Sequence, residues 1–373
     1  MSSIPVASIL SNSITNEMGN AGVFNDGSFA SLVVTGAFTQ ISGGTTVNAN
    51  ALAITHTSGT LNLGTNLTTT GAYTLTAGTL TLNSYTITIL SLSSSNSNVR
   101  SLDFTSLGQI VLTGNAATIL DFTTATNFTT TGTVYINSNY TGATGTRTIN
   151  FGGTAGATES NVLSVATTGT SGIVIGSLAT DTVALTGGFN NVDLTGLTCT
   201  ISNTARSIYG DLTVPTSGGT LTAGTAVTTF AGTTGTDNIS TNGRTLDFPI
   251  TFNGAGGTWN LGSVLTIGST RTTTLTNGTL NLMGYTLTTG TFTTAAGTKT
   301  LITAGGTLAC SAGGTSFNNA ASANFTVTKS GSNGYISLTS SLAQTFAGGG
   351  TTYNGVILNQ GGSGAVTVTG ANT

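Results

Sequence analysis

Apolar and polar residues alternate in short runs along most of the chain. Clear examples lie at residues 31–35, 109–113, 182–186, 191–195 and 365–369. Each run has a period of two and is bounded by Gly, Asn or Ser, which is the pattern of a half-buried β-strand. Threonine fills many of the polar positions, because its branched Cβ suits an extended backbone while its hydroxyl faces water. No helical periodicity follows the first part of the chain, so the pattern predicts an all-β protein.

The chain also nearly repeats itself in its second half. Residues 59–64 return as 257–262 with an offset of 198, and residues 78–82 return as 278–282 with an offset of 200. Shorter matches keep nearly the same spacing: residues 85–88 with 285–288, and residues 127–129 with 324–326. Self-similarity at a fixed period is the sequence signature of a repeat architecture.

The spacing inside each copy predicts the size of the structural unit. The Gly-Thr units begin at positions 59 and 78 in the first copy, an offset of 19, and at positions 257 and 278 in the second, an offset of 21. About 20 residues fit one coil of a parallel β-solenoid, in which two or three short strands are joined by tight bends. We expect Leu61, Leu63, Leu80 and Leu82 to form apolar ladders inside the stack, because a single coil cannot bury its apolar face alone.

We therefore predict an elongated parallel β-solenoid of roughly 20-residue coils. It extends over residues 38–373, with approximate long repeats at 38–175 and 236–373. Roughly 17 or 18 coils at the inter-strand spacing would give a rod on the order of 80 Å long. Antiparallel sandwich or fibre repeats and an amyloid-like polymer are the alternatives. The Asn-Gly and Asp-Gly pairs that favour hairpins are few, at residues 26–27, 242–243, 277–278, 333–334 and 354–355.

The two ends differ from the repetitive region. Residues 1–37 stand outside the repeats, and we predict that they form a cap or attachment segment, since the first coil of a stack otherwise exposes an unpaired edge. Residues 370–373 stop in the middle of the pattern without a polar cap. We expect the native polypeptide or its assembly to continue beyond this point.

Composition restricts the function classes. Charged residues make up 5% of the 373 residues, the net charge is −3, and the first basic residue is Arg100. Seven basic residues spread singly along the chain give no footprint for nucleic acid. The N-terminus lacks the basic region of a secretory signal, and no apolar run approaches the roughly 18 residues of a membrane helix. Apolar residues at 37% are nevertheless enough to form a core.

Residues with catalytic or ligating potential are sparse. Cys199 and Cys310 lie in strand-like runs and are predicted to be buried small side chains without a disulfide. His56, the only histidine, is predicted to lie at the surface at a strand end. Glycoside hydrolysis, the usual activity of enzymatic β-helices, needs two carboxylates facing one sugar. The best candidates are Asp103 with Asp121 and Asp237 with Asp247, and neither pair is convincing. We predict no catalytic, cofactor-binding or metal-binding residues, and no enzyme.

A second short motif consists of Arg, a hydroxyl residue, an aliphatic residue, an acid or amide, and Phe. It occurs at residues 100–104, 147–151 and 244–248. We expect each arginine to point outward at the start of a strand, where its charge discourages lateral association, and the aliphatic and Phe residues to point inward. A role of the arginines as ligand contacts is the alternative.

At residues 278–288, and at residues 343–358, the chain resembles repetitive Gly/Thr-rich β-solenoid proteins. Such proteins occur among bacteriophage virion fibres and tail appendages and among bacterial surface adhesins. The resemblance implies an elongated, non-catalytic structural fibre or decoration that projects toward and adheres to a host surface. We also predict homo-oligomers, attachment to other virion proteins through the N-terminal segment, and a glycan or protein receptor on the host surface. A secreted bacterial adhesin or surface filament is the alternative, and a polysaccharide-acting β-helix enzyme is the third.

Overall fold

The computed structural model describes side chains or backbone for residues 53–115, 117–138, 145–155, 158–175, 181–319 and 323–373, and the backbone of 31–34, 38–39 and 47–49. The chain divides into two compact units, Met1–Gly188 and Phe189–Thr373, called unit 1 and unit 2 below. The described residues form strands and turns and contain no helix. The prediction of an all-β protein is therefore confirmed. The predicted segment 1–37 lies outside the described residues, except for Ser31–Val34.

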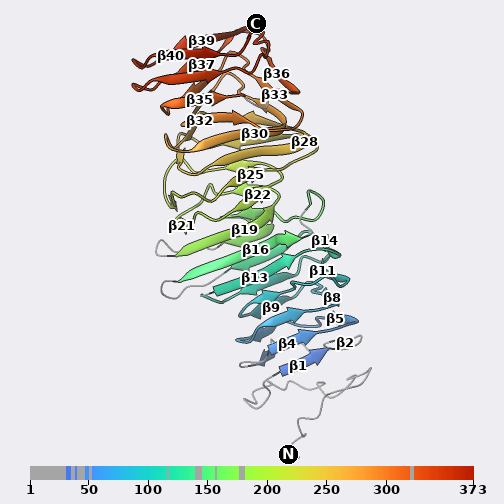
Figure 1. The fold of residues 1–373 in the computed structure, drawn as a ribbon. Coiled ribbons are helices and arrows are strands. Elements are labelled where there is room, and N and C mark those ends of the chain that lie inside the picture. Colours follow the sequence, from blue (N-terminus) through green and yellow to red (C-terminus); the bar gives the residue numbers. More distant parts are fainter. Residues whose placement is uncertain are drawn as a thin grey trace, which may run out of the picture. The chain divides into compact units, whose positions relative to one another are not determined.

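Unit 1 is built from three ladders of parallel strands (Figure 1). The first contains β1 (Ser31–Val34), β4 (Ala53–His56), β7 (Tyr73–Leu75), β10 (Leu92–Ser93), β13 (Ala117–Thr124), β16 (Thr146–Ala155) and β19 (Thr182–Phe189). The second contains β2 (Phe38–Thr39), β5 (Thr60–Asn62), β8 (Gly78–Thr81), β11 (Arg100–Phe104) and β14 (Phe128–Gly132). The third contains β3 (Val47–Ala49), β6 (Leu67–Thr69), β9 (Thr86–Ile89), β12 (Gln109–Leu112), β15 (Tyr135–Ser138) and β18 (Gly172–Ile175).

Unit 2 has the same plan. One ladder contains β22 (Arg206–Ile208), β25 (Thr228–Phe230), β28 (Ile250–Leu261), β30 (Thr272–Asn281), β32 (Thr291–Thr294), β35 (Gly314–Asn318), β38 (Gln344–Ala347) and β40 (Val366–Thr369). Another contains β27 (Thr245–Leu246), β29 (Leu265–Ile267), β31 (Thr286–Thr289), β34 (Thr307–Cys310), β37 (Gly334–Leu338) and β39 (Val356–Gln360). The third contains β20 (Val192–Asp193), β23 (Leu212–Thr213), β26 (Thr236–Ser240), the second halves of β28 and β30, β33 (Lys299–Ile302) and β36 (Phe325–Thr328).

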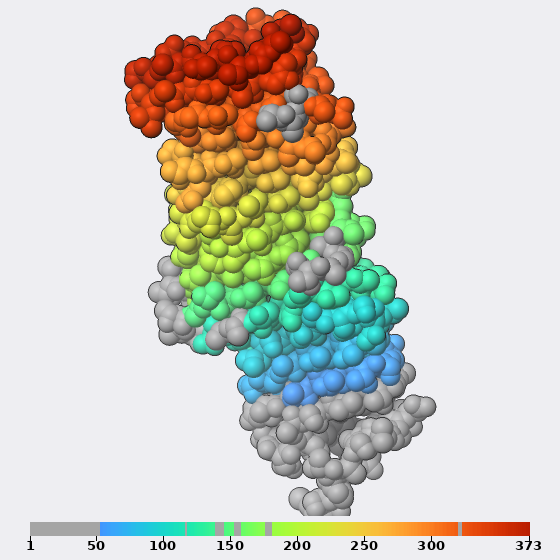
Figure 2. All heavy atoms as spheres, viewed as in Figure 1, coloured from blue at the N-terminus to red at the C-terminus, as the bar shows by residue number. Residues whose placement is uncertain are grey.

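Successive strands of a ladder come from successive passes of the chain. Within each unit, bands of sequence colour follow one another in order along the stack (Figure 2). All the pairs named above are parallel, so the Asn242–Gly243 turn joins strands of different ladders and is not a hairpin. This pairing is consistent with a β-solenoid and does not fit an antiparallel sandwich.

The sequence offset between paired positions varies more than the repeat spacing predicts. Ile54 pairs with Tyr73, an offset of 19, whereas Tyr135 pairs with Gly172, an offset of 37. The longer step includes the turn at 158–161, where the amide N of Asn161 donates to the carbonyl O of Thr158. The expectation of a nearly constant coil length is therefore wrong in this part of unit 1.

The core consists of inward-facing residues in direct register. Leu61 pairs with Leu80, and Leu63 and Leu82 are buried like them, which confirms the inward position of the four predicted leucines. Leu102, which was not among these four, continues the ladder from Leu80. In unit 2, Phe292, Phe317 and Phe346 form a stack whose ring centroids are 5.5 and 4.5 Å apart. Identical side chains in register keep neighbouring strands aligned, because a slip by one residue would turn every apolar group outward.

The two sequence repeats occupy equivalent places in the two units. Leu80 faces Leu61 in unit 1, and Leu280 faces Trp259 in unit 2. Gly78 begins β8 and Gly278 lies within β30, with φ of +94° and +85°. A Cβ at Gly78 would approach the carbonyl O of Gly59 to 2.3 Å, and one at Gly278 would approach that of Gly254 to 2.5 Å. Only glycine fits such a left-handed, closely approached position. The internal duplication is thus preserved at the level of backbone conformation.

Candidate functional site

The candidate carboxylates for glycoside hydrolysis have separate structural partners. Asp103 lies in β11 and Asp121 in β13, which belong to different ladders. Asp103 accepts hydrogen bonds from the amide of Thr105 and the hydroxyl of Thr131, both at 2.9 Å. Desolvation raises the pKa of Asp103, but these hydrogen bonds outweigh it and hold the pKa below its usual value. Asp103 is therefore held as an ionised acceptor, which is the opposite of a general acid.

The second carboxylate pair is also divided. Asp247 forms an ion pair with Arg271, with Oδ1 and Nε 2.8 Å apart. Asp237 lies in β26, where it pairs with Trp259 of β28. Among the described residues, no three His, Cys, Asp or Glu side chains are close enough to hold a metal ion.

His56 is fully buried, so the expectation of a surface position is wrong. It does lie at the end of β4, but it shares the inward face with Ile54. Its Nδ1 lies 2.9 Å from the Tyr73 hydroxyl, and its Nε2 lies 3.3 Å from the carbonyl O of Gly59. Burial is the main cause that lowers the pKa of His56, and it raises that of Tyr73. The pair satisfies its own polar groups inside the core.

The arginines of the Arg-to-Phe motif also differ from the prediction. Arg100 and Arg147 are each 1% exposed, and the expected outward position is wrong for both. Arg244 is half-buried, and its guanidinium donates to the carbonyl O atoms of Gly218 and Gly219. The inward position of Leu102, Phe104, Ile149, Phe151, Leu246 and Phe248 is confirmed.

Arg100 is surrounded by main-chain oxygen atoms at one corner of unit 1. Its guanidinium donates to the carbonyl O of Ser94 at 2.7 Å, of Asn98 at 2.8 Å and of Thr126 at 2.7 Å, and also to that of Thr124. Its Nε also donates to the Ser94 hydroxyl at 2.7 Å. Burial lowers its pKa. These carbonyl dipoles replace water around the charge, so the arginine closes the corner and offers nothing to a ligand.

Lys299 fills the equivalent corner of unit 2, and no sequence motif singled it out. Its backbone pairs with Gly278 and Phe325, as that of Arg100 pairs with Gly78 and Phe128. Its ammonium donates to the carbonyl O of Gly297 at 3.0 Å and of Ala323 at 2.9 Å, and burial lowers its pKa. The sequence offset between the two cations is 199, between the offsets of 198 and 200 of the long repeat, and this is the signal that could have found Lys299.

Arg147 and Arg206 are two further buried cations. Arg147 forms an ion pair with Asp181, with Nη2 and Oδ2 2.7 Å apart. Arg206 lies 5.8 Å above the Phe248 ring and donates to the carbonyl O of Ser202 at 3.0 Å. Burial lowers the pKa of Arg206 to about 10, so it stays charged at neutral pH.

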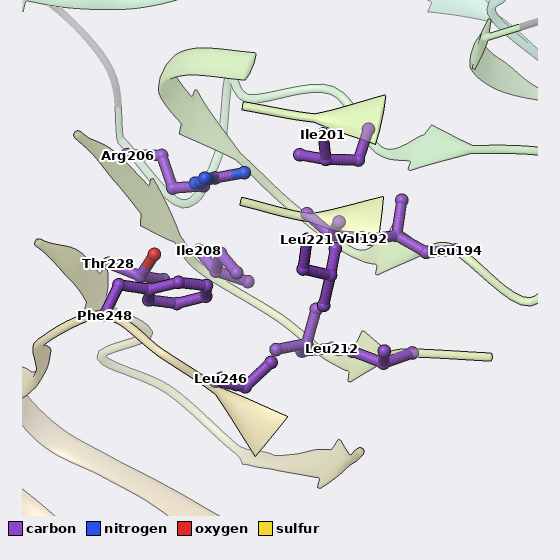
Figure 3. Close-up of a pocket in the computed structure, with 11 residues that line it drawn as sticks. Val192, Leu194, Ile201, Arg206, Ile208, Leu212, Leu221, Thr228, Leu246 and Phe248 are labelled. Atoms are coloured by element: carbon purple, nitrogen blue, oxygen red, sulfur yellow. The ribbon is translucent and has the colours of Figure 1, made fainter. Parts of the chain in front are cut away.

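A cavity of about 20 Å³ lies beside Arg206 in unit 2 (Figure 3). Its walls are apolar apart from Arg206 and Thr228, and consist of Val192, Leu194, Ile201, Ile208, Leu212, Val214, Leu221, Leu246 and Phe248. This volume holds on the order of one water molecule and is far below the several hundred Å³ of a typical ligand pocket. We interpret it as a packing defect among the very short strands of this region.

Both cysteines are buried and free, as predicted for small core side chains. Burial raises the pKa of the Cys310 thiol to about 12, which makes it a poor nucleophile. Within the described part of the chain, a helix able to traverse a lipid bilayer is absent.

An exposed surface with two tyrosines lies on the ladder of β31, β34, β37 and β39. Thr286, Thr307, Tyr335 and Ile357 stand in direct register on its outer side. Met283 and Tyr285 lie at the corner that leads into β31. We call these six residues the tyrosine face. Four of them are large and exposed: Met283 at 48%, Tyr285 at 39%, Tyr335 at 40% and Ile357 at 42%.

Comparisons with protein-family models, with curated proteins and with solved structures give no significant match for this chain.

Proposed function

We propose that the protein is a non-catalytic structural fibre or decoration of a bacteriophage virion, folded as a parallel β-solenoid, which projects toward the host and adheres to its surface. The observation that carries the proposal is the use of the polar groups in the core. His56, Arg100, Arg147 and Lys299 are buried and are hydrogen-bonded by neighbouring parts of the stack. They stabilise a scaffold and leave the exposed faces for recognition.

Several features support a structural role over catalysis. The candidate carboxylates are divided between ladders or engaged in other contacts, and the cavity in unit 2 accommodates only about one water molecule. Parallel strands in register, by contrast, give a stiff scaffold that presents outer side chains at a regular spacing of about 4.8 Å. A bacterial surface adhesin would use the same scaffold, and the two functions differ in the structure to which the protein is attached.

The proposal assigns residues 1–37 to attachment on other virion proteins and places the protein in the particle as a homo-oligomer. The test compares incorporation of the full chain and of a chain lacking residues 1–37 into particles, with immunogold labelling as the readout. We expect the truncated chain to fold, as judged by circular dichroism, but to be missing from particles. Normal incorporation of the truncated chain contradicts the assigned anchor, and absence of the full chain from particles contradicts the virion function.

A further inference from the structure

We propose that the tyrosine face of unit 2 is a binding site for a neutral polysaccharide. The inference rests on the adhesive function proposed above and names the chemistry of the receptor. A sugar ring has apolar C–H faces and a rim of hydroxyl groups. A complementary protein surface therefore combines exposed aromatic rings with uncharged hydrogen-bonding groups, and the tyrosine face has both.

The two tyrosines lie two layers apart in the stack, with the strand of Thr307 between them. Tyr285 directly precedes Thr286, which pairs with Thr307, and Thr307 pairs with Tyr335 on the next strand. Two strand spacings correspond to roughly 10 Å between the backbones that carry the two tyrosines. Glycines occupy the positions in register with Tyr285 on the next two strands, namely Gly306 and Gly334. These two positions therefore contribute no side chain of their own beside Tyr285.

The hydroxyl groups on this face are available to a ligand. The side chains of Thr286, Thr307, Tyr285 and Tyr335 make no hydrogen bond within the described residues. Tyrosine suits such a place because it combines a large apolar body with a polar tip at low conformational cost. An exposed cluster of this kind on an otherwise Thr-rich surface indicates an interaction site.

The charges around the face favour a neutral ligand. None of its six residues is charged. Lys329 lies at its edge near Gly355, and its ammonium donates to Asn333 Oδ1 at 2.9 Å. An anionic glycan would meet one cation that already has a hydrogen-bond partner, whereas anion sites commonly use several converging cations or backbone amides.

The equivalent place in unit 1 differs in a way that supplies a matched control. Tyr85 corresponds to Tyr285, but Gln109 occupies the position of Thr307. Its Nε2 donates to the hydroxyl of Thr86 at 2.9 Å. The side chains beside Tyr85 thus satisfy each other, and we expect this tyrosine to contribute little to binding.

The test is affinity electrophoresis of the full chain in native gels that contain laminarin, mannan, dextran or, as the anionic arm, dextran sulfate. We expect retardation by at least one of the three neutral polymers. Tyr285→Ala and Tyr335→Ala should each raise the apparent Kd about tenfold, as for an aromatic contact at the centre of a site. Thr307→Val, which removes only a hydroxyl, should raise it about threefold.

Tyr85→Ala and Leu342→Ala, the latter at an exposed apolar position that is not part of the tyrosine face, should leave the Kd within about twofold. Three results overturn the proposal: no retardation by any neutral polymer, retardation by dextran sulfate alone, or equal losses in the control variants. A fourth contradicting result would come from sedimentation velocity. If Tyr335→Ala changes the oligomeric state but not the binding of polysaccharide, the face is a contact between copies of the chain. Incorporation of Tyr335→Ala protein into particles reports separately on the fibre function.

Discussion

Two equivalent corners, one in each unit, each contain a buried cation, but the side chain that supplies it differs. Arg100 in unit 1 donates to four main-chain carbonyl groups, whereas Lys299 in unit 2 donates to two. A planar guanidinium with five donors bridges more loop than a compact ammonium. Asn127 and Asn324, both with φ of +57°, end the loops that the two cations face. Each corner thus contains a buried positive charge that donates to carbonyl groups of the adjoining loop, and the number of these contacts differs between the two side chains.

The largest expected effect comes from removing each cation in turn. Arg100→Ala leaves four carbonyl groups, that of Ser94 buried and the others partly buried, without their donor, and should destabilise the corner by about 3–5 kcal/mol. Lys299→Ala leaves two and should cost about 1–3 kcal/mol. Amide hydrogen exchange of the full chain measures the stability of each corner separately. Protection of β11 and β14 reports on Arg100, and protection of β33 and β36 reports on Lys299. Equal losses of protection at the two corners would show that the number of carbonyl contacts is not what matters.

A conservative exchange sharpens the same comparison. Arg100→Lys keeps the charge but provides three donors on one atom, so it cannot reach all four carbonyl groups. We expect a loss of about 1–2 kcal/mol, between the wild-type chain and Arg100→Ala. The same exchange measurement over β11 and β14 tests it. A Lys variant as stable as the wild type would show that charge alone closes the corner.

Acid should destabilise unit 1 more than unit 2, because unit 1 contains the buried His56 and unit 2 has Phe252 at the corresponding place. The pKa of His56 is lowered in the folded state, so the unfolded chain binds the proton more readily. The contribution of the neutral, buried His56 to the stability of unit 1 is fully present above pH 6.5, its pKa in the unfolded chain. This contribution is lost as the pH falls toward the lower pKa of His56 in the folded chain. The loss approaches about 1.4 kcal/mol per pH unit within this window.

Hydrogen exchange of β4 and β7 between pH 7.5 and 5 measures this loss, with β28 and β30 as the internal reference. The double variant His56→Phe, Tyr73→Phe removes the titrating group together with the hydroxyl that would lose its acceptor. It should make β4 and β7 respond to acid as the reference strands do. Persistent acid sensitivity of the double variant would assign the effect to other groups.

The smallest expected effect concerns the turns after the repeated leucines. Asn83 in unit 1 and Met283 in unit 2 have φ of +53° and +51°, a region that Asn tolerates better than Met. Asn83 also donates from Nδ2 to the carbonyl O of Leu63 at 2.6 Å. Met283→Asn should stabilise unit 2 by about 0.5–1 kcal/mol, measured as a higher midpoint of thermal unfolding. A lower midpoint would mean that the Met283 side chain contributes packing that outweighs the strain.

Much of this architecture can be predicted from the sequence, because a period of two and a long repeat determine strands and their stacking. The same period, applied strictly, also places Arg100 on the face of Leu102 and Phe104, and His56 on the face of Ile54. The general expectation that charged and polar residues face water led to the wrong positions for these side chains. The local pattern does not show the loops that supply the carbonyl partners. The carbonyl groups of Thr124 and Thr126, for example, accept from Arg100 but belong to the next pass of the chain.

The proposed binding surface was harder to predict. Tyr285 and Tyr335 follow the strand pattern without breaking it, and nothing in the sequence shows that Thr307 lies between them. Their proximity depends on an offset of 28 from Thr307 to Tyr335, compared with an offset of 21 from Thr286 to Thr307. Because successive coils contain different numbers of residues, a fixed repeat length does not predict which residues of different coils lie side by side.

The unequal steps have one more consequence, for protein engineering. The layers of unit 1 keep their register both across the short step from Ile54 to Tyr73 and across the long step from Tyr135 to Gly172. The number of residues between paired strands can therefore change at the turn of residues 158–161 without a change in how the strands pair. A foreign epitope grafted there would be displayed outside the stack, and the layers before and after it would keep their pairing.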